Sequence, residues 1–478
     1  MLEKKNFHVF RKDDRHFLFL TLPVALFSID AETYGVLRKV EVAQTLDGDG
    51  EATRWEELNQ FADRYMERAK PARSVRSPED ITDKVIGAYL FVCQECNLKC
   101  AYCYGNEGEY GKRGRMSETV MNRAFEQFFS GGEGKHFVTF FGGEPLMNFP
   151  LMEKTAELVQ SYRDEGKADI NLCIVTNGTL YNPKIDAFFR EHISDVTFSL
   201  DGPKALNDAQ RVAKSGDSVY DLAEENIRKL TKDAPFGWSF RSIVTRAGCD
   251  QVDEIYQHME SFNPGGIGIV DVDAPKDGPL YIGDADYQRF LKQVVDINRR
   301  GLASIMDGEA PVAFEYPFYI LYYFVSRRHA YYHCNAGTNL LAVTAEGDVY
   351  PCHRFVGQED FKMGNVGDPE LKSSERYQGI RQQFIDATVD NRVGCRDCWA
   401  RYLCGGSCAK FSFSEHGSIS PPVARHCQYI KTVVEELLPD LVALMEQPEQ
   451  RSKLVTRLGN AIRGGVADSR VQGEMHGA

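Results

Sequence analysis

Three cysteines stand close together in one short stretch, Cys96, Cys100 and Cys103, with the spacing C-x3-C-x2-C. Thiolates are the usual protein ligands of [4Fe–4S] clusters, so this stretch could bind three irons of one cube. The fourth iron would then lack a protein ligand and would be open to a small molecule that chelates through an amino and a carboxylate group. Half of a zinc site and the thiols of a redox protein remain alternatives at this point.

A second group of cysteines lies near the C-terminal end of the chain. Cys395, Cys398, Cys404 and Cys408 follow one another at short spacings, with Cys334 and Cys352 before them and Cys427 after them. One four-cysteine zinc site would explain four of these seven thiols and leave three unexplained. The remaining cysteines are interpreted as core or incidental residues. They are Cys93, Cys173 and Cys249.

Composition limits the classes of protein that fit. The chain has 478 residues, a net charge of −13 and no long basic run, which argues against a nucleic-acid partner. No apolar run is long enough for a membrane span, and the N-terminus lacks the apolar core of a signal peptide. We therefore expect a cytoplasmic protein with no membrane partner. Thirteen cysteines in such a chain indicate metal ligation more than disulfides.

The cysteine-rich stretches must be positioned by folded domains, and the hydrophobic pattern predicts several. Residues 1–70 alternate like β-strands and then turn amphipathic, which predicts a small α/β module, with Asp30 capping a helix. Residues 71–83 are interpreted as a linker. From 84 to 330 the pattern is strand, loop, helix, repeated in six βα-type units. Residues 331–430 hold the second cysteine group, and residues 431–478 are expected to form a C-terminal helix and tail. The amphipathic pattern predicts a closing helix over Tyr429–Met445 and a second helix over Arg451–Ile462.

Candidate chemical residues follow the predicted strands, where barrels place their active sites. Gly142-Gly143-Glu144-Pro145 follows the second strand, and its glycines allow a ligand to approach the backbone closely while Glu144 suits an ammonium group. Ser199 ends the fourth strand, and Arg211 comes soon after it. Asp201 is interpreted as a turn residue.

Together, the C-x3-C-x2-C stretch and the Gly-Gly-Glu-Pro turn one helix later resemble the radical SAM enzymes. That resemblance implies a [4Fe–4S] cluster that binds S-adenosylmethionine (SAM), and a partial (β/α)6 TIM barrel open on one side. It implies cluster ligation by Cys96, Cys100 and Cys103. It also implies the SAM-binding residues Tyr102, Gly142, Gly143, Glu144, Pro145, Ser199 and Arg211. The histidine that related enzymes carry before this arginine is Asn207 here, so no role is assigned to it.

The order of the second cysteine group resembles the SPASM domain, which implies two auxiliary [4Fe–4S] clusters and three clusters in all. By that pattern one auxiliary cluster is held by Cys395, Cys398, Cys404 and Cys427. The other is held by Cys334, Cys352 and Cys408. The latter is one ligand short, and His329 and His333 are candidates to complete it, although both also fit a structural role.

The sequence around these motifs resembles thioether-forming peptide maturases, over about residues 84–430. One matching group matures the γ subunit of quinohemoprotein amine dehydrogenase by linking cysteine sulfur to methylenes of aspartate or glutamate. The SCIFF maturases, which link cysteine sulfur to an α-carbon, are the alternative. A non-catalytic iron–sulfur carrier or chaperone of a partner subunit is an alternative of another class.

This resemblance also implies partners and a base. The N-terminal module resembles leader-peptide recognition domains, which add a peptide as a strand to a sheet edge, with a purely structural cap as the alternative. The expected partners are a small cysteine-containing precursor and a reducing donor such as a flavodoxin or ferredoxin. His353 follows Cys352, where sulfatase-maturing enzymes carry an aspartate that accepts a proton, and it is our candidate base.

Overall fold

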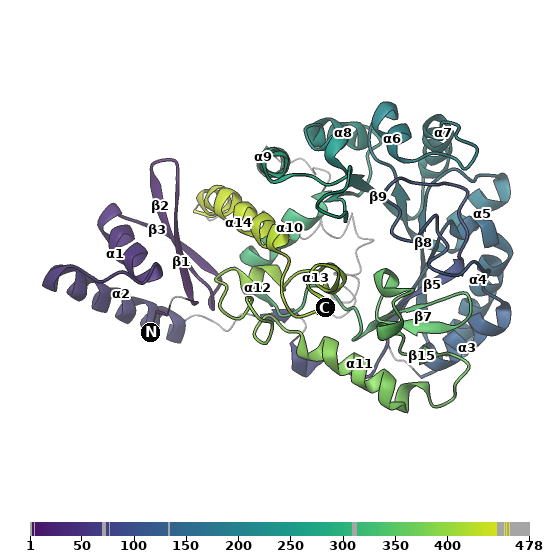
Figure 1. The fold of residues 1–478 in the computed structure, drawn as a ribbon, viewed down its shortest axis with the longest axis horizontal. Helices are drawn as coiled ribbons and strands as arrows, with labels where there is room; N and C mark the ends of the chain where they lie inside the picture. Colours follow the sequence, from purple (N-terminus) through teal and green to yellow (C-terminus); the bar gives the residue numbers. More distant parts are fainter. Residues whose placement is uncertain are drawn as a thin grey trace.

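The computed structural model describes residues 2–3, 5–68, 73–75, 77–131, 134–307 and 313–446, together with Leu454, Thr456 and Leu458. The N-terminal module is a three-stranded antiparallel sheet with the strands β1 (Phe7–Lys12), β2 (Arg15–Leu20) and β3 (Ala25–Ile29) in that order. Two helices follow, α1 (Ala31–Glu41) and α2 (Gly48–Arg68). Asp30 caps α1 by accepting a hydrogen bond from the Thr33 amide at 2.8 Å, as expected from the sequence. Figure 1 shows this module projecting from the larger part of the molecule.

The six strand–helix units are present, and their strands form a curved parallel sheet. The strands are β5 (Gly87–Cys93), β6 (Lys135–Gly142), β7 (Asp169–Thr176), β8 (Ile193–Ser199), β9 (Gly237–Val244) and β10 (Gly266–Asp271). They pair in chain order and in parallel. The helices α3 (Glu118–Phe129), α4 (Phe149–Asp164), α5 (Pro183–His192), α6 (Lys204–Gln210), α7 (Tyr220–Thr231) and α8 (Val252–Glu260) lie outside them (Figure 1). The mixed α/β fold expected from the sequence is confirmed.

The sheet is longer than these six strands because later segments join both of its edges. The strand β11 (Ala313–Phe314) pairs in parallel with β10. At the other edge β13 (Leu340–Val343) pairs in parallel with β5, and β14 (Asp348–Tyr350) and β15 (Gly364–Asn365) continue antiparallel. The result is a ten-stranded sheet in which the second cysteine region supplies three strands. The sequence pattern did not reveal this fusion.

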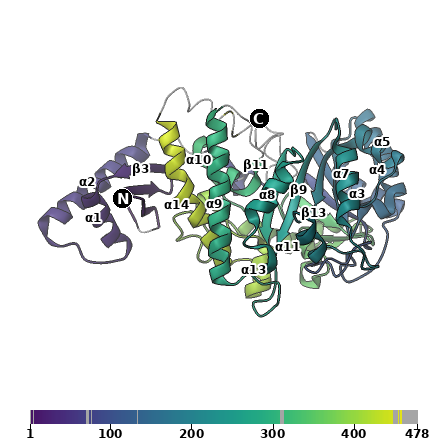
Figure 2. The ribbon, with the colours of Figure 1, turned by 90° about the horizontal axis from the view of Figure 1, so that it is seen from above.

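Long helices connect the barrel to the N-terminal module. They are α9 (Asp284–Asp307), α10 (Glu315–Ser326) and α14 (Ala424–Met445), and Figures 1 and 2 place α14 between the module and the barrel. The helices α11 (Glu375–Asp386), α12 (Arg401–Cys404) and α13 (Ala409–His416) belong to the second cysteine region. The expected closing helix at Tyr429 therefore begins five residues earlier than predicted, at Ala424. Most of the expected helix over 451–462 and the tail after it lie outside the described residues.

The segment expected to be a linker contains a short strand. That strand, β4 (Arg73–Val75), pairs in parallel with β12 (Arg328–Ala330), which directly follows α10. The pairing ties the end of the N-terminal module to the start of the second cysteine region. Within the part of the chain that the structure describes, no helix is long and apolar enough to cross a membrane.

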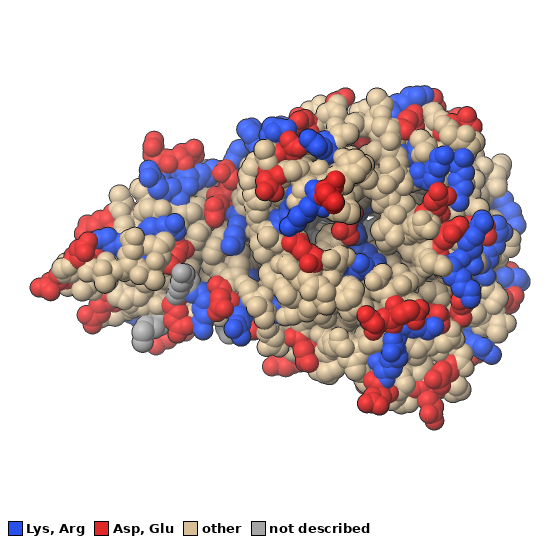
Figure 3. Space-filling model, viewed as in Figure 1, with Lys and Arg blue, Asp and Glu red and all other residues tan. Residues whose placement is uncertain are grey.

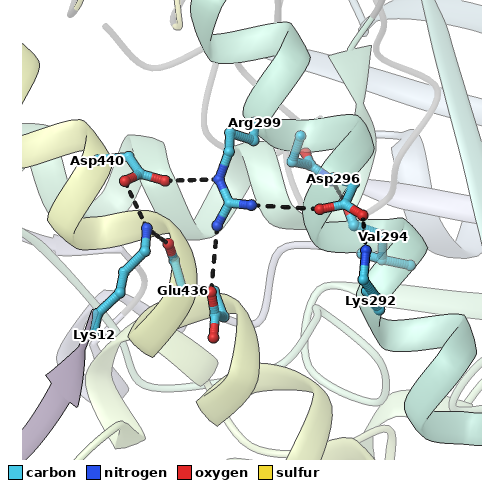
Figure 4. A network of polar contacts seen from close by, with 8 residues as sticks. Lys12, Lys292, Val294, Asp296, Arg299, Glu436 and Asp440 are labelled. Carbon is cyan, nitrogen blue, oxygen red and sulfur yellow. Dashed lines mark hydrogen bonds and ion pairs between the residues drawn. The ribbon is translucent and has the colours of Figure 1, made fainter.

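Ionic contacts attach the N-terminal module to α14. Lys12 of β1 donates to the Asp440 carboxylate at 2.5 Å, and Arg299 of α9 reaches Asp440 and Glu436 at 3.0 and 3.3 Å (Figure 4). His8 of β1 lies between Glu41 and Glu435, at 2.6 and 3.0 Å. These contacts make α14 the element on which the module is docked.

Candidate functional site

The first cysteine loop follows β5 and is held by a second stretch of chain. The amides of Lys99 and Ala101 donate to the carbonyls of Val212 and Gln210, at 2.9 and 2.8 Å. Burial raises the pKa of the Cys96 thiol to about 12, and it raises the pKa of Cys100 as well. A thiolate in such a place needs a positive partner, which the irons of a cluster supply. The loop therefore fits the iron–sulfur cluster expected from its spacing.

The Gly-Gly turn lies against this loop and requires glycine. Gly142 has a φ of +133°, and a Cβ on it would lie 2.1 Å from the carbonyl oxygen of Cys93. A Cβ on Gly143 would lie 2.2 Å from the carbonyl oxygen of Glu95. The turn at the end of β6 thus packs directly on the backbone that leads into Cys96. Pro145 begins a 3-10 turn, Pro145–Asn148, that continues into α4.

Glu144 is fully buried and joins the ends of β6 and β7. One carboxylate oxygen accepts from the Thr176 hydroxyl at 2.9 Å and from the Leu146 amide at 3.1 Å. The other accepts from the Asn177 amide at 2.9 Å. Burial outweighs these bonds and raises the pKa of Glu144 to about 7. A cation beside this carboxylate would hold it in the ionised form, which fits the ammonium ligand expected from the sequence.

Asp201 is more than the turn residue that the sequence suggested. It is fully buried and accepts hydrogen bonds from Arg211 at 2.9 and 3.3 Å, and from the Tyr102 hydroxyl at 2.5 Å. It also accepts from the Ile243 amide at 3.0 Å. Asp201 thus holds two of the residues expected to bind SAM, and the Arg211 guanidinium already has a carboxylate partner. A turn signature in the sequence concealed a buried ion pair.

Asn207 takes part in the same network. Its side-chain oxygen accepts from the Asp201 amide at 3.2 Å, so it orders the loop after β8. Ser199, the last residue of β8, lies opposite Arg241 of β9 in the sheet register. The residues expected around SAM therefore come from the loop after β5, the turn at the end of β6, the end of β8 and the segment after α6, and β7 lies between β6 and β8 in the sheet.

Four of the later cysteines line one cavity. It has about 350 Å³ of atom-free space. Its walls include Cys395, Cys398, Cys404 and Cys427. These are the four thiols that the sequence pattern assigned to one auxiliary cluster. Burial raises the pKa of Cys404 well above its usual value, with the three other thiols adding to the effect. The cavity therefore suits four thiolates bound to a cationic cluster core.

The other three cysteines come from three segments: Cys334 lies between β12 and β13, Cys352 after β14, and Cys408 directly before α13. Burial raises the pKa of Cys352, and the neighbouring thiols Cys408 and Cys334 raise it further. His329 lies elsewhere: its ring nitrogen contacts the Leu22 carbonyl at 2.6 Å and its ring stacks on Tyr402. The ring of His333 bonds to the Gly406 carbonyl at 3.0 Å. Both histidines thus have structural partners.

His353 lies in an aromatic box next to the Gly-Gly turn. Its ring centre is 4.5 Å from that of Tyr89 and 4.9 Å from that of Phe141. Burial, together with the charges of Arg354 and Arg241, lowers the pKa of His353 to about 3. A histidine with this pKa takes up a proton poorly near neutral pH. The base role of His353 stays a prediction, and this pKa is unfavourable to it.

Sequence reasoning missed two further residues that shape the site. The Tyr110 hydroxyl donates to the Gly142 carbonyl at 3.1 Å, which links the cysteine loop to the Gly-Gly turn. The Asn177 side chain bonds to Asn97 at 3.0 Å and lies 3.9 Å from the Cys96 sulfur. The position of Asn177 directly after β7 was the only signal in the sequence that could have found it.

Comparison with known proteins identifies two domains. The profile of the Radical SAM superfamily matches residues 90–235, and that of SPASM, an iron–sulfur cluster-binding domain, matches residues 334–399. The iron–sulfur match overturns the zinc alternative for the later cysteines.

Curated relatives match much of the chain. The radical SAM cyclopropyl synthase TigE of Paramaledivibacter caminithermalis is 23% identical, over 92% of this chain and 96% of its own. The cysteine-type anaerobic sulfatase-maturating enzyme of Clostridium novyi is 24% identical, over 66% of this chain and 85% of its own.

A solved structure has the same fold. The sulfatase-maturating enzyme anSMEcpe with bound AdoMet superposes with a TM-score of 0.67 and is 22% identical, over 80% of this chain and 98% of its own. A second structure of anSMEcpe, with AdoMet and the Cp18Cys peptide, superposes with a TM-score of 0.64.

Proposed function

The chain belongs to the peptide-modifying radical SAM enzymes that carry a SPASM domain, and from that premise we propose that it forms thioether crosslinks in a small precursor protein. Its radical SAM domain binds SAM and a [4Fe–4S] cluster, and its SPASM domain binds auxiliary iron–sulfur clusters. In the proposed reaction a cysteine sulfur of the precursor joins a methylene of an aspartate or glutamate, as in the γ subunit of quinohemoprotein amine dehydrogenase. The methylene would lose one hydrogen atom to the radical derived from SAM, the thiol would lose its proton to solvent, and the remaining electron would pass to an auxiliary cluster.

One observation carries the proposal: among the residues that the structure describes, Cys334, Cys352 and Cys408 form a group of three thiols without a fourth. The two histidines considered for the fourth place, His329 and His333, bond to the backbone carbonyls of Leu22 and Gly406. A cluster held by three thiols has one iron open to an outside ligand. A cysteine thiolate of the precursor is the ligand that suits iron best.

The residues of the chain position the reactants. When bound, SAM and its cluster supply a radical able to take hydrogen from a carbon atom. Cys96, Cys100 and Cys103 hold that cluster, and the Gly-Gly turn with the buried Glu144 receives the ammonium group of SAM. The Asp201–Arg211 pair fixes Tyr102 beside the cluster loop. A flavodoxin or ferredoxin is the proposed electron donor.

The precursor is bound at the edge of β3 in this proposal. The N-terminal sheet ends at β3, and a groove with about 620 Å³ of atom-free space runs beside it. Its walls combine β3 with the end of α10 and the last turns of α14. A strand edge beside an apolar groove offers backbone hydrogen bonds and side-chain pockets to an extended peptide.

A second candidate reaction follows from one relative. TigE matches 92% of this chain, and its name states cyclopropyl synthesis. Ring closure within a precursor would then replace sulfur attachment. The SCIFF type of crosslink, to an α-carbon, remains the alternative within thioether chemistry, and a non-catalytic carrier remains the alternative outside enzymes.

The test is anaerobic reaction with SAM, reductant and a small cysteine-containing precursor protein, the γ subunit of quinohemoprotein amine dehydrogenase. We expect a loss of two hydrogens per bridge, with fragment masses that place the bridge between a cysteine and an Asp or Glu side chain. Cys100→Ala should abolish 5′-deoxyadenosine formation. Cys352→Ala should still form it and should lose crosslinking.

Other outcomes select the alternatives. Full crosslinking by the Cys352→Ala variant would remove the role given to the three-thiol group. An α-carbon bridge would favour the SCIFF type, and a loss of two hydrogens with every cysteine still free to react would favour ring closure. Absence of 5′-deoxyadenosine from the wild-type protein, despite full iron content, would support the carrier.

A further inference from the structure

Arg354 has an unusual environment for a half-buried cation. It lies two residues after Cys352, in the 3-10 turn His353–Phe355. Its guanidinium carbon lies 5.5 Å from the ring centre of Tyr104 and 4.7 Å from that of Phe411. Two aromatic rings thus hold the guanidinium by cation–π contacts, which leave its N–H groups available.

No carboxylate or carbonyl uses those N–H groups among the residues that the structure describes. The other arginines near the cysteines are bonded: Arg211 pairs with Asp201, and Arg392 donates to Ser407, Ser412, Ile419 and Ser420. Arg354 has no such hydrogen bond or ion pair in the described structure. The N–H groups of the Arg354 guanidinium are therefore able to donate to a ligand.

Arg354 lies between the SAM-binding cysteine loop and the Cys334, Cys352 and Cys408 group. Tyr104 directly follows Cys103 of the SAM-binding loop, and Phe411 lies in α13, just after Cys408. The neighbouring His353 contacts Phe141, which precedes the Gly-Gly turn. Figure 3 shows the broad part of the molecule hollowed near its centre, with charged side chains on its walls.

The charges around Arg354 are mixed. Arg241 also lies near His353, and the positive charges of Arg354 and Arg241 both lower the pKa of His353. Asp273 is an acidic neighbour of Arg354, while Asp271, at the end of β10, lies 3.8 Å from Arg425. The described structure shows no pairing of Arg354 with either aspartate. A carboxylate brought by a ligand is the partner that fits the fork of a held guanidinium.

We propose that Arg354, clamped between Tyr104 and Phe411, is a subsite for the side-chain carboxylate of the precursor residue that becomes crosslinked. The inference rests on the proposed function and names what selects the acceptor residue. The guanidinium would donate two parallel hydrogen bonds to the carboxylate. The adjacent methylene would then be held between the Cys96, Cys100 and Cys103 loop and the Cys334, Cys352 and Cys408 group. This arrangement predicts a preference for Asp or Glu over Asn or Gln.

The experiment compares acceptor residues in two enzymes. The small cysteine-containing precursor is prepared with its acidic acceptor and with the matching amide, and kcat/KM for crosslinking is measured with wild-type enzyme and with Arg354→Gln. The preference for the acid is the ratio of kcat/KM for the acidic acceptor to kcat/KM for the amide. In Arg354→Gln this ratio should be about 10- to 100-fold lower than in the wild-type enzyme, because a charged hydrogen-bond pair is lost. Arg354→Lys keeps the charge without the fork and should give an intermediate preference.

Controls separate this role from two others. Lys410→Gln removes one positive charge from a half-buried position in α13, where the amine donates to the Ser414 hydroxyl, and should leave the acid preference unchanged. Iron content is counted for each variant. An Arg354→Gln enzyme that keeps full iron and the full acid preference overturns the proposal. So does a variant in which only the KM for SAM rises, since Arg354 would then bind the SAM carboxylate.

A second measurement does not depend on crosslinking. Phenylglyoxal labels accessible arginines, and peptide masses report how fast Arg354 is labelled. N-acetyl-aspartate amide should slow labelling of Arg354, whereas N-acetyl-asparagine amide should not. Equal protection by both probes overturns the carboxylate subsite. If the wild-type enzyme forms no crosslink but the acid alone protects Arg354, the proposed function fails and the subsite stands.

Discussion

The pair formed by Asp201 and Arg211 is the residue contact on which the SAM-side loops most depend. Asp201 is fully buried and Arg211 nearly so, and the carboxylate also holds Tyr102. Removing one partner of a buried ion pair leaves an uncompensated charge, which costs about 3–5 kcal/mol. The loop after β8 should therefore tolerate loss of both charges better than loss of one.

We predict that Asp201→Leu lowers the free energy of unfolding by about 3–5 kcal/mol, measured by anaerobic denaturant unfolding. The double variant Asp201→Leu/Arg211→Met should recover a large part of this loss, because it leaves no buried charge unpaired. A double variant as unstable as the single one would show that the hydrogen bond to Tyr102, not the ion pair, stabilises the loop.

Glu144 gives the protein a pH dependence of unusual sign for a carboxylate. Its pKa is raised from 4.5 to about 7 by burial. Between these values the folded protein keeps a proton that the unfolded chain has released, so stability falls as pH rises from 4.5 through 7. The full change corresponds to about 3 kcal/mol.

The variant Glu144→Gln should flatten this slope, measured as the free energy of unfolding from pH 5 to pH 7.5. It should also be less stable at every pH, because an amide cannot accept from both the Leu146 and Asn177 amides as the carboxylate does. The matched control Glu157→Gln changes a carboxylate on the exposed face of α4 and should keep the wild-type slope. A slope that survives in Glu144→Gln would assign it to another group.

At the scale of elements, the docking of β1 on α14 depends on a protonated histidine. Burial lowers the pKa of His8, but its bonds to Glu41 and Glu435 outweigh burial and raise it above 6.5. Both ring nitrogens face carboxylates, at 2.6 and 3.0 Å, so both donate in the protonated form. This contribution is fully present below pH 6.5 and is lost as pH rises through the raised value.

We predict that amides of β1 exchange with solvent faster at pH 8 than at pH 6, after correction for intrinsic rates, since the deprotonated ring loses its attraction to Glu41 and Glu435. His8→Gln should exchange fast at both values. His16→Gln is the control, because the His16 ring packs on Tyr34 inside the module. The docking role of His8 is wrong if wild-type β1 shows no dependence on pH.

For the whole molecule, the cavity with four cysteines and the N-terminal module share one stretch of chain. Cys398 lines the cavity, Trp399 stacks on His8 with ring centres 4.0 Å apart, and Arg401 donates to the Lys5 carbonyl at 2.6 Å. A cluster in the cavity would therefore order the surface that receives β1. Occupancy of the cavity and docking of the N-terminal module are then linked.

The variant Cys404→Ala tests this link. We expect the loss of one cluster, about four irons, and about tenfold faster amide exchange in β1, because the Trp399 platform loses its support. Iron analysis and hydrogen exchange measure the two effects on the same sample. Cys249→Ala, which removes a thiol bonded to the Arg246 carbonyl, is the control. Loss of iron with unchanged protection of β1 would show that the platform is rigid without the cluster.

Local patterns predicted the barrel well and its long-range joins poorly. The six strand–helix units expected over residues 84–330 are present, because signals such as the apolar spacing of α3 and its Ser117 cap are local. The pairing of β13 with β5, by contrast, joins segments far apart in sequence, and short strands carry no mark of their partners. Within the site, the cysteine and Gly-Gly motifs could be recognised from the sequence. The Asp201–Arg211 pair and the aromatic contacts of Arg354 could not, because they join residues that only the folded chain brings together.

The same pairing has a consequence for how the protein is made. Leu340 of β13 pairs with Gly87 of β5, so the outer edge of β5 has no partner strand until about 250 further residues have left the ribosome. At about 5–20 residues per second, that takes roughly 15–50 seconds. An open strand edge is a template for aggregation, and here it lies directly before the cysteine loop. The nascent chain should therefore be a client of chaperones, and slow translation should lower its yield.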